Sequence, residues 1–115
     1  MMETEKEKIL IKNAKEFYGD AMLAESKKHY NSSVSLFFKS LAVLADLYIL
    51  RKDGKIPSNH SERFRILETK YPDIYRILDK DFPYYQDSYS IELNKEINEV
   101  LKKDVKELFR LLAIN

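Results

Sequence analysis

The chain has 115 residues, with 20 basic and 19 acidic side chains and a formal net charge of +1. This balance excludes the broad positive field of a dedicated nucleic-acid-binding protein. There is no cysteine, which excludes disulfides, thiolate catalysis and cysteine metal sites and fits a reducing, cytoplasmic setting.

The first predicted element is an amphipathic helix over residues 4–28. Alanines and larger apolar residues recur there at helical spacing, while lysine and glutamate fill the other positions. The recurring residues are Leu10, Ala14, Phe17, Ala21 and Ala24. Because three of these are alanines, we expect this helix to lie close to its neighbour. The charged segment at its start lacks the apolar stretch of a secretory signal.

A long apolar segment between Asn31 and Gly54 predicts the central helix. Two apolar rows run along it: Val34, Phe37, Leu41, Leu44 and Tyr48, and Leu36, Val43, Leu47 and Leu50. Only a narrow stripe with Ser35, Lys39 and Asp46 is polar, so neighbouring helices should cover most of this helix. The charged residues interrupt the apolar run, so we expect no membrane-spanning segment and a soluble protein.

Polar residues mark the expected ends of the central helix. Asn31, Ser32 or Ser33 can cap its N-terminus. Gly54 can adopt the left-handed conformation that ends a helix. The short connection before the central helix predicts that the first two helices are antiparallel.

The rest of the chain is expected to contain two short helices and a long one. Ser58 or Asn59 can cap the third helix, and the fourth should run over residues 73–81 and end at Phe82 and Pro83. We interpret residues 84–90 as a polar aromatic connection. Ser90 can then cap the last helix, where apolar residues recur at steps of four and three: Ile97, Leu101, Val105, Leu108 and Leu112.

These elements predict an all-α fold in a single domain over residues 1–115. Two glycines and three prolines leave little room for the frequent tight turns of an all-β fold. The expected architecture is an up-down bundle of four to five helices. Two long antiparallel helices come first, short helices follow a Gly/Pro elbow, and a long helix closes the chain.

The sequence contains few groups that indicate catalysis. The two histidines, His29 and His60, are expected at opposite ends of the central helix, so no metal site is predicted. No glycine-rich phosphate loop is present, and no cofactor is expected. The carboxylates stand beside lysines at helical positions that should face solvent, and we interpret them as surface ion pairs.

A local excess of basic residues surrounds the elbow. Arg51, Lys55 and Arg63 lie close in sequence to His60, which follows a proline turn at the start of a helix. Cations, helix N–H groups and a titratable imidazole are suited to face a phosphate. The alternatives are that these charges are ordinary solvated surface and that His60 packs at the elbow and fixes the loop.

Three tyrosines gather in the segment before the last helix: Tyr84, Tyr85 and Tyr89. They can stack on exposed bases, or they can form a packed lid with their hydroxyls at water. We take Tyr89 as a further candidate contact residue for a nucleic acid or nucleotide.

Three segments together match the outline of a known family: AKEFYGDAMLAE (14–25), YNSSVSLFFKSLAVLADLYILRKDGKIPSNH (30–60) and YYQDSYS (84–90). They resemble the alanine-rich first helix, the apolar second helix with a turn ending in His, and the Tyr-containing loop of the HEPN family of small helical proteins. The resemblance implies a homodimer that contacts RNA, a nucleotide or a nucleotidyltransferase-type partner. The first two helices also resemble a single tetratricopeptide unit.

Active members of the HEPN family are similar to metal-independent ribonucleases that place an Arg shortly before a His near the last helix. Here no histidine follows His60, so Arg76 has no partner. Arg51 and His60 are too far apart, and on the wrong element, to be the same motif. We therefore expect a non-catalytic module. One alternative is a pure protein-interaction bundle that uses apolar residues such as Leu47 and Leu50. The other is a divergent metal-independent ribonuclease that uses His60.

Overall fold

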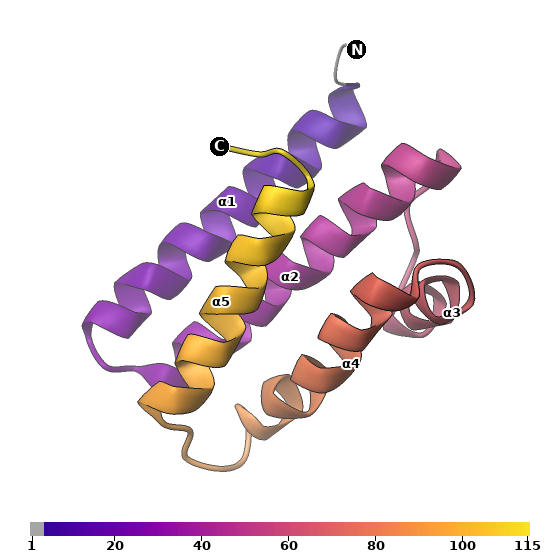
Figure 1. Ribbon diagram of the computed structural model, residues 1–115. Helices are drawn as coiled ribbons and strands as arrows, with labels where there is room; N and C mark the ends of the chain where they lie inside the picture. The colour runs from indigo at the N-terminus through magenta and orange to yellow at the C-terminus, as the bar shows by residue number, and fades with distance from the viewer. Residues whose placement is uncertain (1–3) are drawn as a thin grey trace.

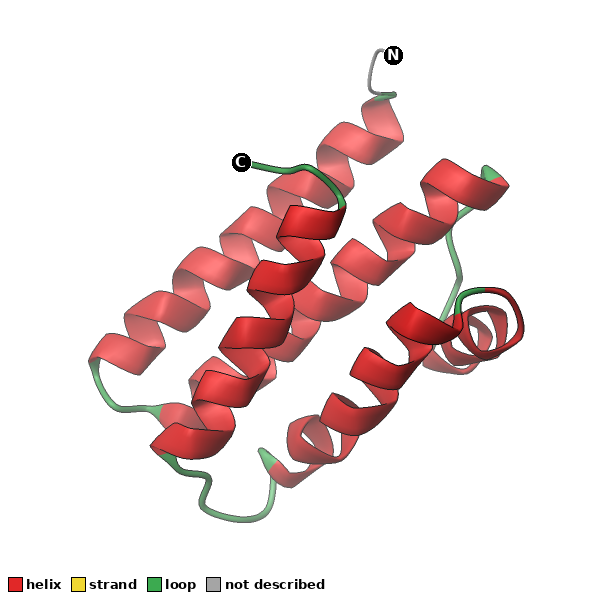
Figure 2. Cartoon of the chain, in the orientation of Figure 1, coloured by secondary structure: helices red, strands yellow, loops and turns green. Residues whose placement is uncertain are grey.

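The computed structural model describes residues 4–115, which form five α-helices joined by short connections (Figures 1 and 2). The helices are α1 (Glu5–Ser26), α2 (Tyr30–Asp53), α3 (His60–Lys70), α4 (Pro72–Asp87) and α5 (Lys95–Leu111). The prediction of an all-α bundle of four to five helices is confirmed. The radius of gyration is 13.7 Å, close to the ~13 Å expected for a compact chain of this length.

Helix α2 lies at the centre and contacts each of the other four helices. Helix α1 runs antiparallel beside it, and together they form one layer. Helices α4 and α5 lie on the near side of this layer in Figure 1, and α3 packs beside α4. The two prolonged apolar rows of α2 explain this placement, because a helix that is apolar over most of its circumference is stable only when neighbours surround it.

The helix ends show which capping predictions hold. Gly54 ends α2 with a φ of 81°, and the Asn59 side chain accepts a hydrogen bond from the backbone N–H of Glu62 at the start of α3. Both were expected. The expected caps of two other helices are wrong: α2 begins after His29 with no side-chain cap, and Asn94, rather than Ser90, caps α5.

The predicted end of the fourth helix at Phe82 and Pro83 is also wrong. Helix α4 continues through Pro83 to Asp87, so Tyr84 and Tyr85 are helical rather than part of a loop. The ring of Phe82 lies 5.2 Å from that of Phe64 and 5.6 Å from that of Phe38. We attribute the continuation of α4 to this aromatic packing, which outweighs the loss of the backbone hydrogen bond that a proline cannot donate.

The core is centred on α2, where Phe37, Leu41, Leu44 and Leu47 are fully buried. Leu47 is therefore not an apolar residue left over for a partner, contrary to the prediction. Asp46 was expected on a polar stripe, but it is only 6% exposed, because α3 covers it. A charge at this depth needs a partner, and the structure provides one.

Among residues 4–115, α2 is the single helix that is long and apolar enough, by length and composition, to cross a membrane. Within the bundle, 67% of its most apolar window is buried. Core helices of bundles commonly pass the same test, because their apolar surface is covered by other helices.

Candidate functional site

The side chain of Asp46 binds Arg63 of α3 through two hydrogen bonds. The guanidinium donates from Nε and Nη2 to the two carboxylate oxygens, at 2.7 and 2.9 Å. The two side chains are only 9% and 11% exposed. This bidentate ion pair joins α2 to α3 and neutralises the Arg63 charge within the fold.

The same guanidinium fixes His60. Nη1 of Arg63 lies 2.7 Å from His60 Nδ1. Because a guanidinium can only donate, Nδ1 accepts and the imidazole carries its proton on Nε2. Burial and the nearby Arg63 charge lower the pKa of His60 from its usual value, so the ring is neutral at pH 7. A neutral imidazole held in this way is a poor binding group for phosphate.

His60 also belongs to an aromatic cluster on the α3 and α4 side of the molecule. Its ring lies 5.5 Å from Phe82, 6.2 Å from Tyr85 and 6.4 Å from Phe38 of α2. The contact with Phe38 places His60 beside the middle of α2, not at its end as expected. The Tyr85 hydroxyl lies 3.0 Å from the hydroxyl of Tyr89. Tyr89 itself is 73% exposed.

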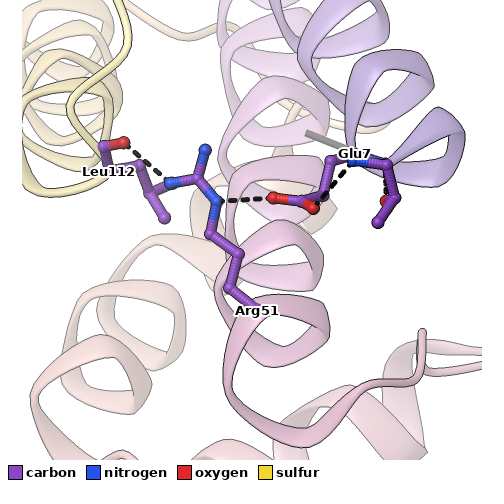
Figure 3. Close-up of polar contacts among 4 residues, drawn as sticks. Glu7, Arg51 and Leu112 are labelled. Carbon is purple, nitrogen blue, oxygen red and sulfur yellow. Dashed lines mark hydrogen bonds and ion pairs between the residues drawn. The ribbon is translucent and has the colours of Figure 1, made fainter. Parts of the chain in front are cut away.

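Arg51 belongs to a different set of contacts (Figure 3). Its Nε donates to Glu7 at 3.0 Å and its Nη1 donates to the carbonyl oxygen of Leu112 at 2.8 Å. Glu7 also closes the capping box with Thr4 at the start of α1. Hydrogen bonds from the Thr4 backbone and from Arg51 lower the pKa of Glu7. Arg51 thus joins the ends of α1, α2 and α5.

The structure therefore divides the five candidate residues. His60, Arg63 and Tyr89 are connected through Tyr85, whereas Arg51 bridges three helix ends. Lys55 is exposed on the connection between α2 and α3, and it forms no ion pair within residues 4–115. Two of the three candidate arginine and lysine charges are already paired inside the protein, which leaves little free positive charge at the elbow.

Two carboxylates between α4 and α5, the buried Asp81 and the half-buried Asp104, were not predicted. Asp81 is fully buried, and its two side-chain oxygens accept no hydrogen bond. When the carboxyl group is protonated, it can itself donate one. Lys80 Nζ lies 2.8 Å from Asp104 and 3.8 Å from Asp81. Burial, followed by the hydrogen bond to Asp104 and that residue's charge, raises the pKa of Asp81 to about 9. Asp81 is thus protonated at pH 7.

Two asparagines hold helices together: Asn31, which was expected as a helix cap, and Asn98, for which no role was predicted. Buried Asn98 of α5 accepts a hydrogen bond from Ser33 and donates to Glu25 at 2.6 Å. Asn31 donates to the carbonyl oxygens of Ser88 and Ile91 and accepts from the backbone N–H of Leu93. Both networks join residues far apart in the chain. The polar Asn98 within an apolar stripe was the available signal for the first one.

The side of the α1–α2 layer that faces away from α5 carries a regular set of apolar residues. The rings of Tyr18 and Phe37 meet at 5.7 Å, and Tyr18 contacts Phe109 of α5. Phe17 and Leu36 come one residue before Tyr18 and Phe37, so each is rotated by about 100° about its helix axis relative to them. They therefore lie on the other side of the contact between α1 and α2, away from α5.

We call this opposite flank the outer face. Its apolar residues recur at intervals of seven on both helices and are all half-buried: Leu10, Phe17 and Ala24 of α1, and Leu36, Val43 and Leu50 of α2. Among residues 4–115, no helix covers the outer face, since α3 and α4 pack against the side of α2 that bears Phe38 and Asp46. The seven-residue spacing was visible in the sequence, but the sequence did not show that these residues would remain uncovered by other helices.

Comparisons with known proteins give no relative: no family model, no curated protein and no solved structure matches this chain.

Proposed function

We propose that this chain is a non-catalytic, HEPN-like helical module that acts as a homodimer formed through the outer face. The observation that carries the proposal is the set of six half-buried apolar residues on one flank of the α1–α2 layer. Rows of apolar residues at seven-residue intervals are the pattern by which helices pack against other helices. Leaving them in water costs free energy that a partner surface would recover.

A second copy of the chain is the occupant that this pattern suits best. A two-fold axis that lies in the plane of the interface turns the outer face of one copy onto that of the other and sets the apolar rows of the two copies against each other. The resulting contact has four helices and is closed, because the same surface is used by both copies. The apolar rows are bordered by Lys39 and Asn13, whose polar side chains can stay at the rim.

For the further partner of the dimer, the geometry favours a protein, such as a nucleotidyltransferase-type partner, over RNA or a nucleotide at the elbow. Arg51 and Arg63 are paired with Glu7 and Asp46, so they add little to a phosphate-binding surface. A metal-independent ribonuclease that uses His60 has the least support, because Nδ1, the ring nitrogen that could act as a base, already accepts a hydrogen bond from Arg63.

Chemical cross-linking tests the homodimer without destabilising it. The chain has no cysteine, so Val43→Cys places one thiol at the centre of the outer face, and Leu111→Cys places one on exposed α5 as the matched control. A short bis-maleimide should convert most of the Val43→Cys protein to a covalent dimer at low protein concentration and leave the Leu111→Cys protein monomeric. Equal, slow cross-linking of both variants would overturn the proposal.

The binding part is tested with labelled structured RNA in EDTA at low and moderate salt, following both mobility and cleavage. We expect intact RNA and no stable complex. A salt-sensitive complex that is weakened by Lys55→Ala and Arg63→Ala would assign RNA as the partner instead. Cleavage that disappears in His60→Ala would restore the ribonuclease alternative.

A further inference from the structure

An open cleft of about 890 Å³ lies between α1 and α5, on the side of the layer opposite the outer face. Tyr18 and Phe109 form its aromatic floor, with their rings 5.6 Å apart and nearly perpendicular. Ala113 and Ile114 add apolar surface at one end. A cleft of this volume is in the range that accommodates a small organic molecule.

The apolar end of the cleft is built by a specific backbone turn. Ala113 adopts a φ of 56°, a left-handed conformation that is unusual for a residue other than glycine. The Ile114 N–H then donates to the carbonyl oxygen of Phe109 at 3.0 Å. This turn brings residues 113–115 back over the last turn of α5, so that Ile114 lines the cleft beside Phe109.

The charged side chains that line the cleft are all basic. Lys15 of α1 and Lys106 and Arg110 of α5 line it, and no acidic side chain does. Arg110 is paired with Glu107. Within residues 4–115, neither Lys15 nor Lys106 forms an ion pair, whereas Lys102 of α5 pairs with Glu25 and Glu99. Two unpaired ammonium groups therefore flank an aromatic floor.

We propose that this cleft binds an organic anion whose apolar or aromatic body lies on Tyr18 and Phe109 and whose carboxylate or phosphate lies between Lys15 and Lys106. Charge complementarity identifies the head group, because two cations without partners attract an anion strongly at short range. The aromatic floor identifies the body, because removal of rings and alkyl groups from water stabilises the complex.

The proposal is independent of the homodimer. The lining residues of α1 are on the flank that faces α5, and the outer face is on the opposite flank, so a second copy on the outer face leaves the cleft open. Failure of either proposal therefore leaves the other intact.

Calorimetric titration of the full chain with three probes tests the site. Adenosine monophosphate supplies an aromatic body with a phosphate, laurate supplies an aliphatic body with a carboxylate, and inorganic phosphate supplies a head group alone. We expect one of the first two to bind with a dissociation constant below about 100 μM, and inorganic phosphate to bind at least about tenfold more weakly. The better probe identifies the source of the anion.

Matched variants locate the site. The double change Lys15→Ala, Lys106→Ala should weaken binding of the better probe about tenfold, because it removes two exposed charge contacts. The control, Lys12→Ala, Lys103→Ala, removes one exposed lysine from each of the same helices outside the cleft and should change affinity less than about twofold. Both pairs are at the surface, so neither should alter folding, which circular dichroism checks.

Three results would overturn the proposal. They are binding of neither organic probe, equal binding of inorganic phosphate, and equal weakening by both lysine pairs. The last would mean that the protein attracts anions only through its general surface charge. If the probes fail and an added polypeptide shifts the NMR resonances of Tyr18 and Phe109, the cleft binds a peptide segment instead.

Discussion

The two flanks of the α1–α2 layer differ in burial although both are apolar. On the inner flank, Phe37, Leu41 and Leu44 of α2 are fully covered by α1 and α5. On the outer face, Leu36, Val43 and Leu50 are only half-buried. One helix thus presents the same type of residue to two environments, and the difference identifies the surface that the fold leaves available.

The comparison also explains why hydropathy alone is ambiguous for α2. A helix that packs inside a bundle on one flank and against a partner on the other reads as apolar almost all round. The same composition satisfies a test for a membrane span. Positions at intervals of seven on both α1 and α2 are what a helix–helix interface requires, which is why we assign the outer face to a second copy.

The largest expected contrast is between Leu47 and Leu50, two leucines of the same helix. Leu47→Ala should lower the free energy of unfolding by about 2–5 kcal/mol, because it opens a cavity in a fully buried core. Leu50→Ala should cost under about 1 kcal/mol, because this residue is only half-buried. Urea denaturation at concentrations where the protein is monomeric measures both. Equal losses would show that the outer face belongs to the monomer core.

The Asp46–Arg63 ion pair tests whether α3 is fixed to the covered side of α2. Asp46→Ala leaves a guanidinium with an 11% exposed side chain lacking its carboxylate, so we expect a loss of about 2–3 kcal/mol in unfolding free energy. It should also lower the pKa of His60 further, because the Asp46 charge raises that pKa and its removal leaves the Arg63 charge unopposed. NMR titration of the imidazole resonances measures that pKa. An unchanged stability would contradict a structural role for the pair.

Asp81 predicts a pH dependence of stability. Its folded pKa, about 9, is above the unfolded value of roughly 3.9, so the folded state binds one more proton between these values. The free energy of unfolding should therefore fall by up to about 1.4 kcal/mol per pH unit from Asp81 as pH rises through that window. Lys80 opposes the rise in the Asp81 pKa and so shortens this pH window, whereas Asp104 extends it.

The variant Asp81→Asn isolates this effect. The amide keeps the shape of the protonated carboxyl and can donate to Asp104, so it should raise stability at pH 8 by about 1–3 kcal/mol and flatten the slope between pH 6 and 8. Denaturation at three pH values is sufficient. A loss of stability at pH 8 in this variant would contradict a protonated Asp81.

A smaller effect is expected where α1 and α2 touch. The Ser40 hydroxyl donates to the carbonyl oxygen of Ala14 at 2.8 Å between two fully buried positions. Ser40→Ala should cost about 1 kcal/mol, the loss of one buried hydrogen bond. Thermal denaturation would detect it. No change would indicate that another group satisfies the carbonyl.

The helices and several of their ends follow from local rules and could be predicted from the sequence. Gly54 and Asn59 act through residues next to them in the chain, so their roles are visible in the sequence. The continuation of α4 through Pro83 could not be predicted, because it depends on Phe82 packing against Phe38 and Phe64 from two other helices. Tertiary packing outweighed a strong local signal.

The candidate site was predicted less well for the same reason. Arg51 and Arg63 are close in sequence to His60, but their charges are neutralised by Glu7 and Asp46, which only the fold brings near. Asp81 and Asp104 are likewise distant in the chain. Charge counted along a sequence overestimates the positive charge that a surface presents when the partners lie on other helices.

The molar mass of the protein in solution tests the central claim most directly. Sedimentation equilibrium of the unmodified chain, of 13.7 kDa, should give twice that mass. Val43→Glu should reduce it to the mass of one chain with an unchanged helical circular dichroism spectrum, because a charge at the centre of the outer face cannot be desolvated. Leu111→Glu, a similar change on α5, should leave the dimer intact. A monomeric unmodified protein, or a dimer that Val43→Glu leaves unaltered, would contradict the account.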